Sequence, residues 1–170
     1  MESQVITSLL AEICDSIRLR GVYARYDWCR DQLSHLLAIS DQVELNDIIL
    51  NMSRLSYLKD TEGHYEWCTP QYAHLLALTP EMVCGKTNKD LLNHVAAATY
   101  QAAEQQVLSD KDKTEAECQL SLPDGTVRQL KTKLYPIQSK KNKVIALLGV
   151  AREVRLTQLV PEYEALGILN

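Results

Sequence analysis

The segment that most constrains this chain is the apolar stretch VIALLGVA at residues 144–151. A strand formed by this stretch would be apolar on both faces, because apolar residues occupy consecutive positions. The two strand-like segments before it, residues 114–122 and 127–137, are apolar on one face only. A strand in the middle of a sheet that is covered on both sides requires such a pattern. The stretch therefore predicts a central strand with both faces covered.

The middle of the chain predicts a hairpin followed by short helices. Residues 55–59 and 65–68 are strand-like and flank a turn that starts with Asp60 and ends with Gly63. Thr69-Pro70 and Thr79-Pro80 each offer a helix N-cap with proline at the first helical position. Asn93 should cap a longer helix, and two strands joined by Pro123-Asp124-Gly125 follow before the final apolar strand. If the last strand pairs with the first, one five-stranded antiparallel sheet results.

The first 52 residues have helical periodicity. We expect breaks at Gly21 and at Ser40-Asp41, with Asp41 as a helix cap. The first helix carries an apolar stripe at i, i+3, i+4 spacing, formed by Val5, Ile6, Leu9, Leu10, Ile13 and Ile17. This stripe is the candidate cover for the second face of the sheet, supplied by this chain or by a partner chain.

Composition and charge exclude several classes of function. The net charge of −4 gives no general attraction to phosphate backbones, so we expect no direct nucleic-acid binding by this segment. No apolar run approaches the roughly 20 residues that span a bilayer, and the N-terminus is not a signal peptide, so we predict a cytoplasmic protein without membrane contact. The five cysteines are scattered and include no C-x-x-C pair, which indicates reduced core residues and no metal site.

These patterns together predict an α+β fold: a five-stranded antiparallel sheet with helices on one face, preceded by an N-terminal helical extension. We divide the chain into an extension at residues 1–46, which serves dimerisation or covers the sheet, a domain at 47–157 and a tail at 158–170. Pro161 and Gly167 suit the start and stop of a short helix in the tail.

At this point the sequence resembles the PAS family of sensory domains, over about residues 45–156. The resemblance rests on the order and spacing of three motifs: Lys59-Asp60 with Gly63, Pro80-Glu81 with Gly85-Lys86-Thr87, and Pro123-Asp124-Gly125. It implies the same five-stranded sheet and a cavity between the sheet and the short helices. The sequence departs from the family where Thr69 replaces a frequent Asn and Glu153-Val154-Arg155 replaces a closing Asp-Ile-Thr.

The resemblance also bears on cofactors, and we expect none. In the flavin-binding branch a reactive Cys follows the Gly that is Gly85 here, and Asn88 stands in its place. Haem-binding members use a His within the long helix, whereas His94 precedes the body of that helix here. We therefore expect neither flavin nor haem.

The resemblance implies a cavity lined by the inward faces of the last strands and by the long helix. The candidate lining residues are Tyr100, Cys118, Leu120, Thr132 and Leu134. A mostly apolar wall with one or two hydroxyl groups would suit a small organic ligand. An ordinary packed core with no ligand is an equally open interpretation of the same residues.

We predict a cytosolic sensor and dimerisation module of a signalling protein, with a histidine kinase, a nucleotide cyclase or a transcription regulator as its output. A homodimer would form through the N-terminal helices. The alternative is a ligand-free interaction scaffold with the same fold. No Ser/His/Asp set, phosphate-binding Gly loop or paired-carboxylate site is present in the sequence, so we do not expect an enzyme.

Overall fold

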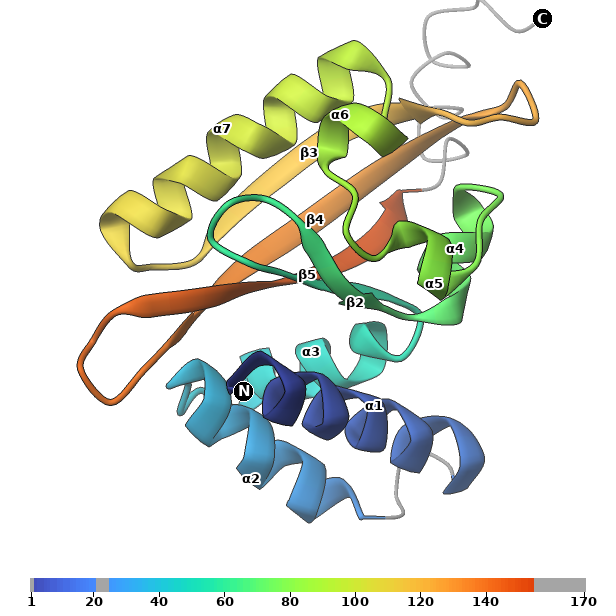
Figure 1. Ribbon diagram of the computed structural model, residues 1–170. Helices are drawn as coiled ribbons and strands as arrows, with labels where there is room; N and C mark the ends of the chain where they lie inside the picture. Colours follow the sequence, from blue (N-terminus) through green and yellow to red (C-terminus); the bar gives the residue numbers. More distant parts are fainter. Residues whose placement is uncertain (1, 21–24, 155–170) are drawn as a thin grey trace, which may run out of the picture.

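The computed structural model describes residues 2–20 and 25–154. A five-stranded antiparallel sheet forms the middle layer, and helices lie against both of its faces (Figure 1). Three helices come first: α1 (Glu2–Arg20), α2 (Tyr26–Leu37) and α3 (Gln42–Met52). The remaining elements are β1 (Leu55–Lys59), β2 (Tyr65–Cys68), α4 (Pro70–Leu75), α5 (Pro80–Val83), α6 (Asn88–Leu91), α7 (His94–Asp110), β3 (Thr114–Ser121), β4 (Val127–Gln138) and β5 (Val144–Val154).

The strand order is β2-β1-β5-β4-β3, so the predicted central strand is confirmed. Strand β5 pairs antiparallel with β1, where Leu58 lies opposite Leu148, and with β4 on its other side. Residues 144 and 146–151 of β5 are buried, as expected for a strand covered on both faces. The apolar pattern therefore identified the strand that joins the β1–β2 hairpin to β4 and β3.

Gly149 on β5 allows an aromatic ring to lie against the backbone of the central strand. Tyr57 on β1 is its register partner, and a Cβ atom built at residue 149 would lie 2.3 Å from Tyr57 Cζ. Any side chain at this position would displace the ring, because real Cβ contacts are longer. Glycine at position 149 thus leaves room for the Tyr57 ring over the sheet, where it makes edge-to-face contact with Tyr65 at 5.3 Å between ring centroids.

Two separate cores lie on the two faces of the sheet. Helices α4–α7 cover one face, as predicted, with Val83, Tyr100 and Val107 buried against Leu134 and Leu147. Helices α1–α3 cover the opposite face (Figure 1). Their buried residues include four of the predicted stripe, Ile6, Leu10, Ile13 and Ile17. The cover of the second face therefore comes from this chain.

The local signals in the sequence place the starts of α3, α4 and α5. Thr69 and Thr79 each accept a hydrogen bond from a backbone N–H in the first turn of α4 and α5, and Asp41 does so for α3. Asn93 precedes α7 as predicted, but its side chain does not cap that helix. It accepts the N–H of Ser121 at 3.1 Å instead, which ties the start of α7 to the end of β3.

The proposed boundary between the N-terminal extension and the domain does not coincide with the end of a helix. It lies between residues 46 and 47, which is inside α3. The tail at 158–170, with its expected helix, and Gly21 lie outside the described residues. Helix α1 ends at Arg20, just before the expected break.

Candidate ligand-binding site

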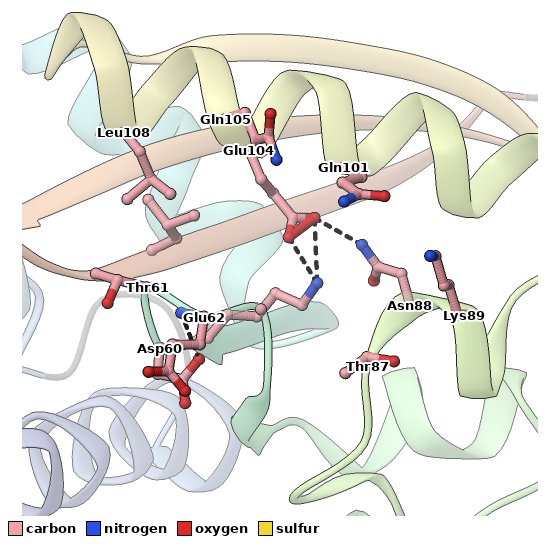
Figure 2. Close-up of a pocket in the computed structure, with 13 residues that line it drawn as sticks. Asp60, Thr61, Glu62, Thr87, Asn88, Lys89, Gln101, Glu104, Gln105 and Leu108 are labelled. Atoms are coloured by element: carbon pink, nitrogen blue, oxygen red, sulfur yellow. Dashed lines mark hydrogen bonds and ion pairs between the residues drawn. The ribbon is translucent and has the colours of Figure 1, made fainter.

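A pocket of about 270 Å³ opens between the turn that joins β1 to β2, the start of α6 and one side of α7. Figure 2 shows its wall. Leu108 and Leu147 provide an apolar surface, and polar residues provide the remainder. The polar residues include Lys59 at the end of β1, Asn88 at the start of α6 and Glu104 in the middle of α7. The site thus combines three elements that are far apart in the sequence.

Lys59 and Glu104 form a buried ion pair in this wall. Lys59 Nζ lies 2.7 Å from Glu104 Oε1 and 3.1 Å from Oε2 (Figure 2). The two side chains are 0% and 8% exposed. Alternation along β1 places Lys59 on the same face as Tyr57, so its side chain points toward α7 rather than toward solvent. The pair joins the end of β1 to the long helix across the pocket wall.

A chain of hydrogen bonds extends from this pair into the core. Asn88 Nδ2 donates to Glu104 Oε2 at 2.7 Å, and Asn88 Oδ1 accepts the Tyr65 hydroxyl at 2.7 Å. The Tyr65 and Tyr72 hydroxyls lie 2.9 Å apart. Because the Tyr65 proton is used toward Asn88, Tyr72 must donate to Tyr65. Every donor in the chain therefore points toward the carboxylate of Glu104, an arrangement that stabilises its negative charge.

Burial determines the protonation of the groups around the carboxylate. Burial lowers the pKa of Lys59 from its ordinary value, and the charge of Glu104 opposes that change. Burial raises the pKa of Tyr65 and of Tyr72 well above the ordinary value, so both hydroxyls keep their protons at neutral pH. Lys59 Nζ also lies 4.5 Å from the centroid of the Tyr65 ring, a cation–π contact. The pocket wall therefore presents a balanced pair of charges, and the two tyrosine hydroxyls behind it donate within the network.

The structure brings together the five residues that the sequence nominated, in the core beside this pocket. The Tyr100 and Thr132 hydroxyls lie 3.0 Å apart, both buried, and Leu120 and Leu134 are buried in the same core. Cys118 is partly buried against it. None of the five lines the pocket described above. Whether they contact a ligand stays a prediction.

Sequence reasoning did not identify Lys59 or Glu104 as site residues. A signal was present in the alternation of β1, where Lys59 occupies an inward position two residues after Tyr57. Glu104 lies in an alanine-rich helix whose periodicity is too weak to show which face is buried. Asn88 stands where the flavin-binding branch has its reactive cysteine, and this position gives no indication that its amide binds Glu104 and Tyr65.

The residues relevant to cofactors and metals occupy surface positions or form part of turns. His94 is the first residue of α7 rather than preceding that helix, and it is exposed. Cys84 is exposed, in contrast to the expectation that all five cysteines are core residues, and all five are free thiols.

Asp60, Glu62 and His64 carry ligand-type atoms within 4.8 Å of one another. However, Asp60 Oδ1 already accepts the backbone N–H groups of Glu62 and His64, which accounts for the cluster as a turn.

Comparison with known families identifies the fold. The sequence model of the PAS fold matches residues 51–158. The chain therefore belongs to the PAS family, as the motifs at the hairpin and at the short helices implied. A search of curated proteins gave no match.

Solved structures support the same fold at low sequence identity. The VqmA dimer of Vibrio cholerae superposes with a TM-score of 0.57 at 16% identity, over 69% of this chain and 53% of that chain. The PAS-B domain of Drosophila melanogaster Cycle with bound glycerol gives 0.52 at 10% identity, over 59% and 99% of the two chains. A PAS domain from Colwellia psychrerythraea gives 0.50 at 16% identity, over 59% and 85%.

The similarity to VqmA covers only part of that protein. The chain spans 53–61% of the length of the VqmA structures that it matches. Those structures are described as VqmA bound to DPO and as a VqmA–ligand–DNA complex. At 15–16% identity the likeness shows the fold alone. Among the described residues, none of the helices has the length and apolar character that crossing a bilayer requires.

Proposed function

We propose that this chain is the sensor module of a signalling protein and binds a small organic ligand in the pocket between the β1–β2 turn, α6 and α7. The observation that carries the proposal is the cavity of about 270 Å³ with the Lys59–Glu104 pair in its wall. Drug-sized ligands occupy cavities of roughly 300 Å³ and more, so the ligand would be smaller. VqmA, which shares the fold, is described with bound ligand.

The position of the pocket supports a sensing role. Its wall includes the last residue of β1 and Leu147 of β5, and these two residues are register partners in the sheet. A ligand held there contacts the central strand, whose other face is covered by α1–α3. Binding would stabilise one packing of the sheet against these helices relative to another. The resulting shift between the two conformations would be transmitted to an output domain.

Blocking the pocket is expected to abolish ligand binding. Gln105 lines the pocket and is exposed, so tryptophan at this position would fill the opening without entering the core. Fragments found by ligand-observed NMR screening should bind Gln105→Trp at least roughly tenfold more weakly, because the side chain occupies their volume. Gln106→Trp is the matched control, since Gln106 is an exposed neighbour on α7 outside the pocket. Equal binding to both variants, or no fragment hits at all, would contradict the proposal.

We also propose a homodimer that forms through the outer surface of the N-terminal helices. Ile6, Leu10, Ile13 and Ile17 of the predicted stripe are buried and unavailable. Val5, which the sequence placed in the same stripe, is instead 69% exposed, and Val43 on α3 is 78% exposed. The VqmA structure of Vibrio cholerae is described as a dimer. A second copy of the chain is the proposed occupant, because homo-oligomers most commonly form two-fold dimers.

Sedimentation velocity tests the dimer. The whole chain should sediment as a dimer at high micromolar concentration, and Val5→Glu with Val43→Glu should weaken association at least roughly tenfold by placing charge in the interface. Val127→Glu is the control, since Val127 on β4 is 45% exposed and lies outside these helices. A monomer at every concentration would refute the dimer and favour a role that needs no self-association.

The finer assignments rest on composition. The net charge of −4 is the reason to expect no nucleic-acid contact by this segment. Free thiols at all five cysteines are typical of a reducing compartment, which supports a cytosolic location. The output, a kinase, a cyclase or a transcription regulator, would be a separate domain. We propose that the described part has no catalytic role, because its one buried charged pair is held in a structural network.

A further inference from the structure

The wall of the pocket presents an unused amide donor beside an unused carboxylate acceptor. Lys59 makes two hydrogen bonds to Glu104, and its ammonium also lies over the Tyr65 ring. Asn88 Nδ2 carries two protons and makes one hydrogen bond among the described residues, to Glu104 Oε2. The Glu104 carboxylate can accept about four hydrogen bonds, and it accepts two from Lys59 and one from Asn88. The free lone pair belongs to Oε1, because Oε2 accepts both Lys59 Nζ at 3.1 Å and Asn88 Nδ2 at 2.7 Å. Oε1 is part of the same carboxylate, so Oε1 and Asn88 Nδ2 can contact neighbouring polar atoms of one ligand.

The charges of the wall favour a neutral ligand. The ammonium of Lys59 and the carboxylate of Glu104 cancel each other, and both are nearly inaccessible to water. An ammonium or carboxylate group brought against this pair would lose its hydration without gaining an unpaired partner. At the rim, Glu62 and Lys89 are exposed and opposite in charge, so solvent screens them. Asp60 is half-buried, and its carboxylate acts on Lys59 and is occupied by the N–H groups of its own turn.

We propose that the site recognises a small, uncharged ligand that carries a cis-amide or equivalent edge, with an N–H beside a carbonyl oxygen. The N–H donates to the free lone pair of Glu104, and the carbonyl accepts the free proton of Asn88. The carbon part of the ligand lies against Leu108 and Leu147, which form the apolar wall. This inference rests on the proposed function of the pocket and adds the chemical class of its ligand.

The network behind the wall fixes the orientation of this recognition edge. The Asn88 amide cannot rotate, because Tyr65 donates to its oxygen and the nitrogen faces Glu104. Tyr72 holds the Tyr65 hydroxyl in turn. Lys59 holds the Glu104 carboxylate in place through contacts to both of its oxygens. A preorganised donor and acceptor discriminate strongly against a ligand that lacks the matching group, because the buried partner is then left unpaired.

Four small probes of similar size test the class: 2-piperidone, N-methyl-2-piperidone, piperidine and cyclohexanecarboxylate. The second lacks the N–H, the third is a cation at neutral pH and the fourth is an anion. Binding is measured with ¹⁵N-labelled whole chain by NMR, following the side-chain amide resonance of Asn88. We expect 2-piperidone to shift this resonance and to bind at least roughly tenfold more tightly than the other three. Gln105→Trp should abolish the shift, and Gln106→Trp should preserve it.

The outcomes separate the ligand class from the function of the pocket. If a charged probe or the N-methyl compound binds as tightly as 2-piperidone and Gln105→Trp abolishes that binding, the ligand class is wrong and the pocket keeps its function. If none of the four binds while screened fragments do, the ligand class alone is overturned. If 2-piperidone binds equally well to Gln105→Trp, the assignment of this edge to the pocket wall is overturned.

Discussion

Lys59→Met alone is expected to lower the free energy of unfolding by about 3–5 kcal/mol, because it leaves the Glu104 carboxylate buried without its counter-charge. Restoring neutrality should recover most of this loss. In the double variant Lys59→Met with Glu104→Gln, the amide oxygen still accepts from Asn88 and no charge is buried. Urea unfolding followed by circular dichroism measures both variants.

An exposed ion pair on the sheet provides the matched control. Lys131 Nζ lies 2.8 Å from Glu115 Oε1, as close as the buried pair, but the two side chains are 31% and 41% exposed. Lys131→Met should therefore cost at most about 1 kcal/mol. If Lys59→Met and Lys131→Met lower stability equally, the Lys59–Glu104 pair is not desolvated as described, and the electrostatic argument for a neutral ligand fails with it.

Above about pH 10 the chain is expected to unfold steeply, with release of tyrosine protons in the same transition. Burial raises the pKa of five of the eight tyrosines: Tyr57, Tyr65, Tyr72, Tyr100 and Tyr135. The folded state keeps these protons at a pH where the unfolded chain loses them. The stability that they contribute is complete below about pH 10 and is lost as the pH rises toward the folded pKa, by about 1.4 kcal/mol per pH unit for each tyrosine.

Other buried groups modify this transition without reversing it. Burial raises the pKa of Cys14 and of Cys68 to about 12. Their thiols therefore also lower the free energy of unfolding as the pH rises, starting from roughly pH 8.5. Lys59 acts in the opposite sense, because its folded pKa is lowered and the unfolded state binds the proton more tightly just below about pH 10.4. One lysine does not offset five tyrosines.

Simultaneous measurement of tyrosinate absorbance and ellipticity during an alkaline titration checks the prediction. The two signals should change together for the five buried tyrosines. Tyr100→Phe removes one linked proton and should make the transition less steep in pH. A chain that ionises more than three of its eight tyrosines while its ellipticity stays constant would show that the five hydroxyls are accessible to solvent, contrary to the described packing.

The sequence predicted the elements whose causes are local. Thr69 and Thr79 cap helices because the hydroxyl and the first-turn N–H groups are neighbours along the chain. Residues 144–151 predicted the central strand because burial on both faces requires an unbroken apolar run. Asn93 is the instructive exception. It does precede α7, but its side chain accepts the N–H of Ser121, 28 residues away, and does not cap the helix. Only the folded chain brings these two residues together, so the sequence could not show this hydrogen bond.

What the sequence determined by itself is the positions of the strands and short helices and the doubly covered character of residues 144–151, because periodicity and capping act over a few residues. The strand order followed only from the condition that the last strand pairs with the first, which the structure confirms. Only the tertiary structure decided which chain covers the second face and where charge is buried. Lys59 and Glu104 are 45 residues apart, and each alone is an ordinary surface residue type. Their pairing arises because β1 ends under the middle of α7, a consequence of long-range packing that no local pattern encodes.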